Sequence, residues 1–271
     1  MKKYFVYSIF TIWIASFSIM CGSLAFNIFS DQEDVKLGKQ LDDEIKSKPQ
    51  EYPLLQNRND VKSYVEQVGQ KILNSPHVKK RGLYAYSFEI VHDDNTINAF
   101  ATPGGYIYVY TGLLKFLDNE ATLAGIIGHE IAHAERRHAT QRLTKYYGAS
   151  MLVSVILGES PSQLAEIAAN MFTGLAFLAN SRSDETESDD YSIRYLKDTE
   201  YYPGAIKYFF DKIQSTKGER GGSIERLLST HPMPQDRVDF VYQEMKKIGD
   251  PQPTENNLFT ARYQAFKTTL P

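Results

Sequence analysis

Residues 129–133 of the chain read His-Glu-Ile-Ala-His. Two histidines four positions apart project from one face of a helix, because four residues are little more than one turn. Zinc binds imidazole nitrogens at about 2.0–2.1 Å, so His129 and His133 could share one metal ion. Glu130 could then act as the base for a water on that metal. The stretch predicts one catalytic Zn²⁺ per chain.

The flanking residues predict a helix around this motif. Asp118 or Asn119 can cap its start, and Glu120 lies near the positive end of the helix dipole. The helix is expected to run on to Gly148, a residue type that commonly ends helices. Apolar residues recur at helical spacing, at positions 123, 126, 127, 131 and 134. The alternative is an amphipathic core helix with two incidental histidines, although packing does not explain why they flank a glutamate.

The N-terminus has the pattern of an export signal. Lys2 and Lys3 precede an uncharged apolar run over residues 4–20, as in secretory signal peptides. The run is also close to the length of about 17–25 residues that spans a bilayer. Residues 1–25 are therefore either a signal peptide or a retained membrane anchor. Cys21 lies where a bacterial lipoprotein carries its lipid, although the preceding Ser-Ile-Met is a poor lipobox, so lipidation stays open.

Length and charge favour one catalytic domain without a nucleic-acid partner. The chain has 271 residues, of which 42% are hydrophobic and 23% charged, and this suits a single domain, assigned to residues 30–249. Residues 250–271 contain several Pro, Asn and Thr residues and are expected to form a loosely held tail. The net charge of -3 gives no electrostatic case for nucleic acid. The sequence leaves the oligomeric state open.

Hydrophobic periodicity predicts an α+β fold that is mainly helical. The expected elements are helices over 30–47 and 58–74, strands at 86–92, 98–101 and 106–110, a helical turn at 113–117, and later helices at 203–215 and 234–247. The small sheet of about three strands comes directly before the motif helix in the chain. It is therefore expected to pack beside that helix.

Two segments admit more than one interpretation. The stretch 151–178 is apolar and rich in small residues, and it could form core helices, a membrane-apposed flap, or a lid over the cleft. The strand at 106–110 alternates tyrosine with aliphatic residues, which is most often ordinary sheet packing. The sharper interpretation is that an edge strand near the metal pairs with an extended peptide substrate through main-chain hydrogen bonds.

A third metal ligand is expected from an acidic cluster later in the chain. His138 follows His129 by nine residues, whereas a metzincin needs a histidine ten residues on, so that class is excluded. His77 and His92 belong to no local motif and are expected to be surface or packing residues.

Glu185 and Asp189 lie four apart on one face of the helix that the acidic cluster starts. Glu185 can complete a His-His-Glu site, while Asp189 can hydrogen-bond the far nitrogen of a ligand histidine. Glu187 points away from that face and serves as an internal control.

Taken together, these motifs resemble the gluzincin metallopeptidases of the CaaX-prenyl-endopeptidase and HtpX superfamily, and in particular its exported BepA-like bacterial branch. The resemblance rests on His-Glu-Ile-Ala-His, on the spacing of Ser181, Arg182, Glu185 and Asp189, on Thr-His-Pro at 230–232 with Arg237, and on the segment 98–105. It covers residues 30–248. Ser188 replaces the alanine usual before the aspartate. The chain also lacks the several membrane spans of the HtpX and prenyl-protease members.

The resemblance implies a zincin-type domain in the bacterial periplasm or envelope. It implies that His129, His133 and Glu185 bind zinc and that Glu130 is the general base. His231 is expected near the metal, either hydrogen-bonding the scissile carbonyl or acting as a reversible fourth ligand; in isolation it could equally be a loop-packing residue. Arg237 either holds that loop or stabilises the oxyanion.

We group Asn98 with these supporting residues. The implied activity is endoproteolysis of misfolded or misassembled envelope proteins. The alternative is an exported metal-binding, chaperone-like or latent protease module.

Overall fold

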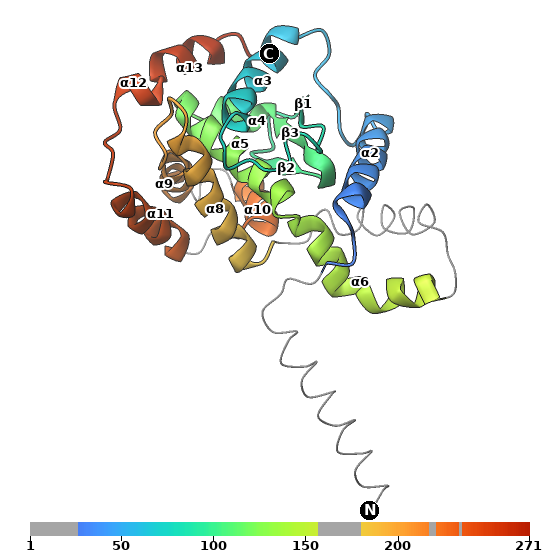
Figure 1. Ribbon diagram of the computed structural model, residues 1–271. Helices are drawn as coiled ribbons and strands as arrows, with labels where there is room; N and C mark the ends of the chain where they lie inside the picture. Colours follow the sequence, from blue (N-terminus) through green and yellow to red (C-terminus); the bar gives the residue numbers. More distant parts are fainter. Residues whose placement is uncertain (1–26, 157–179, 217–220, 233–234) are drawn as a thin grey trace, which may run out of the picture.

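The computed structural model describes residues 27–156, 180–216, 221–232 and 235–271. Helices surround one small mixed sheet, which confirms the predicted α+β, mainly helical fold (Figure 1). The segment 1–25, expected to be a signal or anchor, and most of the apolar stretch 151–178 lie outside the described residues. Within the described residues, no helix is both long enough and apolar enough to cross a bilayer.

The three predicted strands are confirmed, and they form one sheet. They are β1 (Ser87–Val91), β2 (Ala99–Ala101) and β3 (Tyr106–Tyr110), in the order β1-β3-β2. Strand β3 is parallel to β1 and antiparallel to β2, so the tyrosine-rich strand 106–110 is central and is not the edge strand considered for peptide pairing. Strand β2 therefore has one free edge, and the short 3₁₀ turn η1 (Pro103–Gly105) connects it to β3.

Helix α2 (Asp31–Ser47) covers one side of the sheet and its connecting turn. The hydroxyl of Tyr108 on β3 is buried and donates to the Asp42 carboxylate on α2 across 2.7 Å. Close approach depends on Gly38, where a Cβ would lie 1.9 Å from the backbone oxygen of Pro103. Only glycine lets the helix lie so near the turn.

Helix α5 (Glu120–Glu135) carries the motif and is buried along its whole length. The Asn119 side chain accepts the backbone N–H of Thr122, so the cap lies at one of the two expected positions. The expected extension to Gly148 is wrong. Helix α5 ends at Glu135, Arg137 has a φ of 66°, and a separate helix, α6 (His138–Ile156), leads away from the body (Figure 1).

Some of the remaining helices contact α5 directly, whereas others pack on its neighbours. They are α3 (Asn59–Leu73), α4 (Thr111–Phe116), α8 (Arg182–Lys197), α9 (Ile206–Thr216), α10 (Gly221–Thr230) and α11 (Gln235–Lys247). Helix α8 makes the most extensive contact with α5. The Ser192 hydroxyl of α8 donates to the Gly125 carbonyl of α5 across 2.7 Å, and a Cβ at Gly128 would lie 2.9 Å from the same hydroxyl. Small residues therefore bring together the two helices that carry the acidic and histidine motifs.

The C-terminal residues differ from the loosely held tail expected from their composition. They form α12 (Glu255–Leu258) and α13 (Thr260–Lys267). Tyr263 is fully buried and donates to the Leu114 carbonyl across 2.7 Å. Arg262 donates twice to Glu120 at the start of α5, at 2.5 and 2.6 Å. The Pro and Asn residues of this segment suggested a loose tail, but its buried aromatic residues anchor it to the body.

Candidate metal centre

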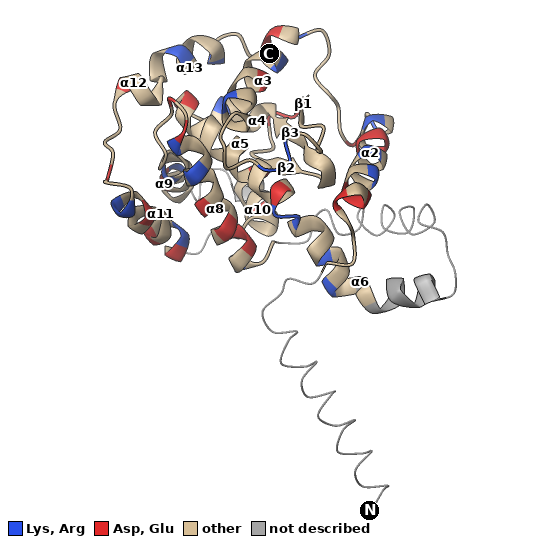
Figure 2. Ribbon diagram, viewed as in Figure 1, with Lys and Arg blue, Asp and Glu red and all other residues tan. Residues whose placement is uncertain are grey.

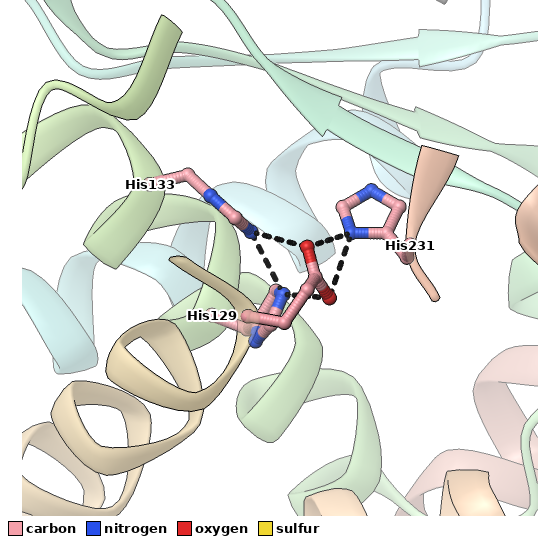
Figure 3. Close-up of side chains that lie close together, drawn as sticks. His129, His133 and His231 are labelled. Atoms are coloured by element: carbon pink, nitrogen blue, oxygen red, sulfur yellow. Dashed lines mark hydrogen bonds and ion pairs between the residues drawn. The ribbon is translucent and has the colours of Figure 1, made fainter. Parts of the chain in front are cut away.

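Four potential metal-binding side chains converge beside the middle of α5. His129 and His133 lie on α5, Glu185 on α8, and His231 directly after α10. All four are buried, and one donor atom from each lies within 4.8 Å of the others. Figure 3 shows the three histidine rings pointing toward one another. The structure thus brings together residues from three separate parts of the sequence.

The spacing of these donors suits a tetrahedral cation. Zinc bonds of about 2.0–2.1 Å place neighbouring ligand atoms about 3.4 Å apart. The Nε2 atoms of His129 and His133 are 2.9 Å apart, and they lie 3.5 and 3.3 Å from the Glu185 oxygens. The His231 Nδ1 atom lies 3.1 Å from the same carboxylate. Two imidazoles and a carboxylate are also the donor types that zinc prefers, so the residues fit this metal.

Asp189 fixes the orientation of His129. Its Oδ1 atom lies 2.9 Å from the His129 Nδ1 atom, as the four-residue spacing from Glu185 predicts. Because a carboxylate only accepts, Nδ1 carries the proton of the neutral ring and Nε2 offers its lone pair to the centre. Burial lowers the pKa of His129, but the hydrogen bonds and charges of Asp189 and Glu185 outweigh it and raise that pKa to about 9.

Arg237 lies behind the donors and is almost completely buried. Its Nε and Nη2 atoms donate to Asp189 at 2.7 Å, and its Nη1 atom donates to Glu185 at 2.6 Å. Nη1 also donates to the Pro232 carbonyl at 2.9 Å, directly after His231. Burial would raise the pKa of Asp189, but Arg237 and His129 hold it below its usual value. Four of the five guanidinium donors are thus committed to the centre and the His231 loop.

The second motif histidine has a different neighbour. The Nδ1 atom of His133 lies 2.9 Å from the Nδ1 atom of His138, the residue that the sequence excluded as a metal ligand. Burial and the charge of His129 lower the pKa of His133 well below its usual value, against the effect of Glu185. Glu187, expected to be an internal control, is not among the four converging donors, yet its carboxylate lies 2.8 Å from the Nε2 atom of His138. It is therefore not an inert control.

Glu130 lies next to the donor cluster without joining it. Its side chain is buried, and its carboxylate lies 3.8 Å from the Nε2 atom of His231. Burial raises the pKa of Glu130, while the charges of His231 and His129 and the backbone amide of Ala101 oppose that rise. A buried carboxylate with a raised pKa beside candidate metal ligands has the placement and chemistry of a proton acceptor.

Asn180 contacts the centre, although it belongs to no recognisable sequence motif. Its side-chain amide donates to the Glu185 carboxylate across 2.7 Å and lies 3.4 Å from both His133 and His231. An asparagine directly before a Ser181 helix cap reads as an ordinary loop residue, so only the fold reveals this contact. The amide donor stabilises the ionised form of Glu185.

A cleft opens beside Glu130 along the free edge of β2. Asn98, Phe100, Ala101, Glu130 and His231 line it, among others. The backbone groups of Asn98 and Thr102 bond to β3, so alternation turns the Ala101 amide toward the outer edge. The Asn98 side chain accepts the Ala99 N–H at 3.0 Å, which places it at the rim of the cleft.

The remaining histidines lie away from the centre, as the sequence predicted. His92 is exposed, and the half-exposed His77 ring lies 3.7 Å from Asp198.

Comparison with known proteins identifies relatives of this arrangement. A family model described as Peptidase family M48 matches residues 59–244, which is more than half of the chain. Beta-barrel assembly-enhancing protease of Escherichia coli (strain K12) is 27% identical over 184 residues, covering 65% of this chain and 37% of that protein. Mitochondrial metalloendopeptidase OMA1 of Arabidopsis thaliana is 31% identical over 168 residues, covering 62% of this chain and 33% of that protein. The chain thus spans about a third of the length of these relatives.

Proposed function

This chain belongs to peptidase family M48, a family of metallopeptidases, and from that premise we propose that it is a zinc-dependent endopeptidase of the bacterial cell envelope. The membership confirms the family resemblance read from the sequence. The observation that carries the proposal is the placement of Glu130 beside four buried metal-binding side chains. No other arrangement in the described residues combines a candidate metal site with a neighbouring buried carboxylate.

We assign His129, His133 and Glu185 as the three ligands of one Zn²⁺ ion. Bound zinc supplies a Lewis acid that polarises the scissile carbonyl and makes water more acidic. Asp189 holds the His129 ring in the tautomer that presents Nε2. Asn180 and Arg237 keep Glu185 ionised and oriented. The ligands are thus held in place by their neighbours before any substrate arrives.

Glu130 is the general base. Its carboxylate accepts a proton from the attacking water and later donates that proton to the leaving amine. Its raised pKa suits both steps, because a carboxyl group that holds its proton more tightly is a stronger base. The neighbouring Ala101 amide, on the outer edge of β2, orients the carboxylate toward the cleft.

Substrate binds as an extended strand along β2. The outward carbonyl groups of β2 can accept hydrogen bonds from a peptide main chain without selecting its side chains, whereas the outward amides of Ala99 and Ala101 already bond to Asn98 and Glu130. Asn98 borders this edge and supports the transition state through its side-chain amide. The Nη1 atom of Arg142 has no hydrogen-bond partner among the described residues, and the Arg142 side chain also lines the cleft. It can donate to a carbonyl or carboxylate of the bound peptide.

Substrates are misfolded or misassembled proteins of the envelope. Two observations support this: the export pattern of the N-terminus and the printed name of the bacterial relative, a beta-barrel assembly-enhancing protease. The N-terminal segment would also attach the chain to the membrane if it is retained or lipidated at Cys21. We propose no nucleic-acid partner, since acidic and basic residues intermingle on helices such as α2 and α11 (Figure 2).

The test compares Glu130→Gln with the unaltered chain. The variant is expected to bind one zinc ion per chain, measured by metal analysis, and to lose cleavage of unfolded casein by at least a hundredfold. Chelation of the metal should abolish cleavage by the unaltered chain, and added zinc should restore it. Glu66→Gln, at a half-exposed position on α3, is the matched control and should cleave normally. Cleavage by a zinc-loaded Glu130→Gln protein at the normal rate would refute the base assignment.

A second candidate function is a latent or non-catalytic metal-binding module. One observation favours it: His231 offers a fourth donor, and a site with four protein ligands is closed to water. His231→Ala separates the possibilities. Faster casein cleavage by this variant, with zinc content unchanged, indicates that His231 blocks the site. Slower cleavage indicates that His231 assists the reaction. Unchanged cleavage dismisses both roles and leaves His231 as a packing residue.

A further inference from the structure

The two motif histidines are supported by different chemistry on their far sides. His129 faces the carboxylate of Asp189 directly, across 2.9 Å. His133 instead faces another imidazole, that of His138, with 2.9 Å between their Nδ1 atoms. The two rings meet edge to face, with centroids 5.0 Å apart and an interplanar angle of 77°. An imidazole can donate or accept through Nδ1, so this contact alone does not orient the proton of His133.

A carboxylate on the far side of His138 determines which of the two Nδ1 atoms carries the proton. The Nε2 atom of His138 lies 2.8 Å from an oxygen of Glu187. Since an ionised carboxylate only accepts, His138 donates from Nε2, and its Nδ1 atom is left with a lone pair in the neutral ring. That lone pair accepts the Nδ1 proton of His133. The Nε2 atom of His133 then presents its own lone pair to the metal-binding cluster.

We propose that His138 and Glu187 form a positioning relay that holds His133 in the orientation and tautomer needed to bind the metal. The inference rests on the proposed metal site and does not depend on hydrolysis. Neither residue is one of the four converging donors, so both act through His133. Arg136 anchors the outer end, with its Nε and Nη2 atoms each 3.0 Å from Glu187.

The break between α5 and α6 creates the relay. In a continuous helix, residues five positions apart lie about 140° apart around the axis, and His138 would face away from His133. The left-handed conformation of Arg137, with φ of 66°, interrupts the helix and lets the His138 ring contact His133. Asp34 holds this turn by accepting from the Nε and Nη2 atoms of Arg137, at 2.6 and 3.1 Å.

Because the His138 ring is buried, few other groups can replace its hydrogen-bond partners. His138 is 1% exposed, so water has little access to its ring. The Ser188 hydroxyl is the nearest alternative partner of the His138 Nδ1 atom, at 3.4 Å, which is a weak contact. The Glu187 side chain is 37% exposed and reaches the surface. Loss of Glu187 therefore frees His138 to turn or to exchange tautomers without disturbing the buried core.

The experiment measures zinc affinity by chelator competition in full-length chains that also carry Glu130→Gln, so that no hydrolysis interferes. Glu187→Ala and His138→Phe are each expected to weaken zinc binding by about 10–100-fold, the usual effect of removing a residue that orients a metal ligand. The conservative His138→Asn places an amide oxygen near the original Nδ1 position and should restore affinity to within a few fold. Asp190→Ala, which removes a carboxylate paired with Arg194 on the same helix, is the matched control and should bind zinc normally.

A double-variant cycle gives the decisive result. In a chain that already carries His138→Asn, Glu187→Ala should not weaken zinc affinity further. The amide oxygen accepts from His133 whether or not the carboxylate is present. The visible absorption of cobalt-substituted chains supplies a second measurement, since a tilted His133 alters the ligand field while a merely structural defect does not. Zinc affinities of Glu187→Ala and His138→Phe within twofold of the parent would overturn the relay. Failure of the parent chain to bind zinc would instead overturn the proposed function.

Discussion

Replacement of Arg237 by methionine should unfold the metal-free chain at a much lower temperature. Methionine fills a similar volume but leaves the carboxylates of Asp189 and Glu185 without their shared cation, and both are fully buried. Removing one partner of a buried ion pair typically costs about 3–5 kcal/mol, because the remaining charge is neither solvated nor paired. For a chain of this size, each kcal/mol lowers the melting temperature by about 2–4 °C, so the expected decrease is about 6–20 °C.

Circular dichroism melting curves of the metal-free and zinc-loaded chains test this value. Zinc should reduce the difference in melting temperature between Arg237→Met and the unaltered chain, because the cation neutralises part of the charge on Glu185. This difference should also shrink as the pH falls. In the unaltered chain the pKa of Asp189 is held low, so its stabilising contribution is present above the unfolded value and is lost in acid. Without Arg237, burial raises that pKa, and the carboxyl group takes up a proton more readily.

Arg194→Met is the matched control for the same melting experiment. Arg194 pairs with Asp190 on the surface of α8, where its side chain is 51% exposed. Exposed pairs contribute about 0–1 kcal/mol, so the melting temperature should change by no more than about 4 °C. A decrease as small as this in Arg237→Met would show that the buried carboxylates do not depend on the guanidinium.

Three further predictions concern the helix contacts and metal uptake. Arg262→Met should lower the free energy of unfolding in urea by about 1–2 kcal/mol, since Glu120 is buried but Arg262 is 42% exposed and water partly replaces it; an unchanged urea midpoint would contradict this. Gly38→Ala should cost about 1–3 kcal/mol in the same assay, because the new Cβ would overlap the Pro103 carbonyl. Zinc binding should release about one proton per chain near pH 7.5, because the pKa of His129 is about 9 without metal; calorimetry in buffers of different ionisation enthalpy counts that proton, and a value near zero would argue against His129 as a ligand.

The elements that positioned the site could be predicted from local patterns. The helical spacing around residues 129–133 located α5, and alternation located all three strands. The four-residue interval between Glu185 and Asp189 correctly placed both on one face of α8. Each of these signals depends on periodicity within one element, which a sequence displays directly.

The features that the sequence did not predict depend on contacts between distant segments. The end of α5 at Glu135 depends on Arg137, whose left-handed conformation is held by Asp34 about a hundred residues earlier. Non-glycine residues rarely adopt this conformation, and no local pattern indicates it. Asn180 likewise has no motif of its own, and its contact with Glu185 follows from how α8 enters the fold.

If peptide binds along β2 as proposed, the outer edge of this strand also limits which proteins the cleft can accept. A partner that pairs with the outward carbonyls of β2 must offer amides that are not already engaged. Native helices and the interior strands of sheets have no such amides, so under the proposed binding mode a folded protein would not be cleaved. The same substrate protein would be cleaved once one of its segments has unfolded. Selectivity of this kind would depend on whether a substrate segment is unfolded and not on its sequence.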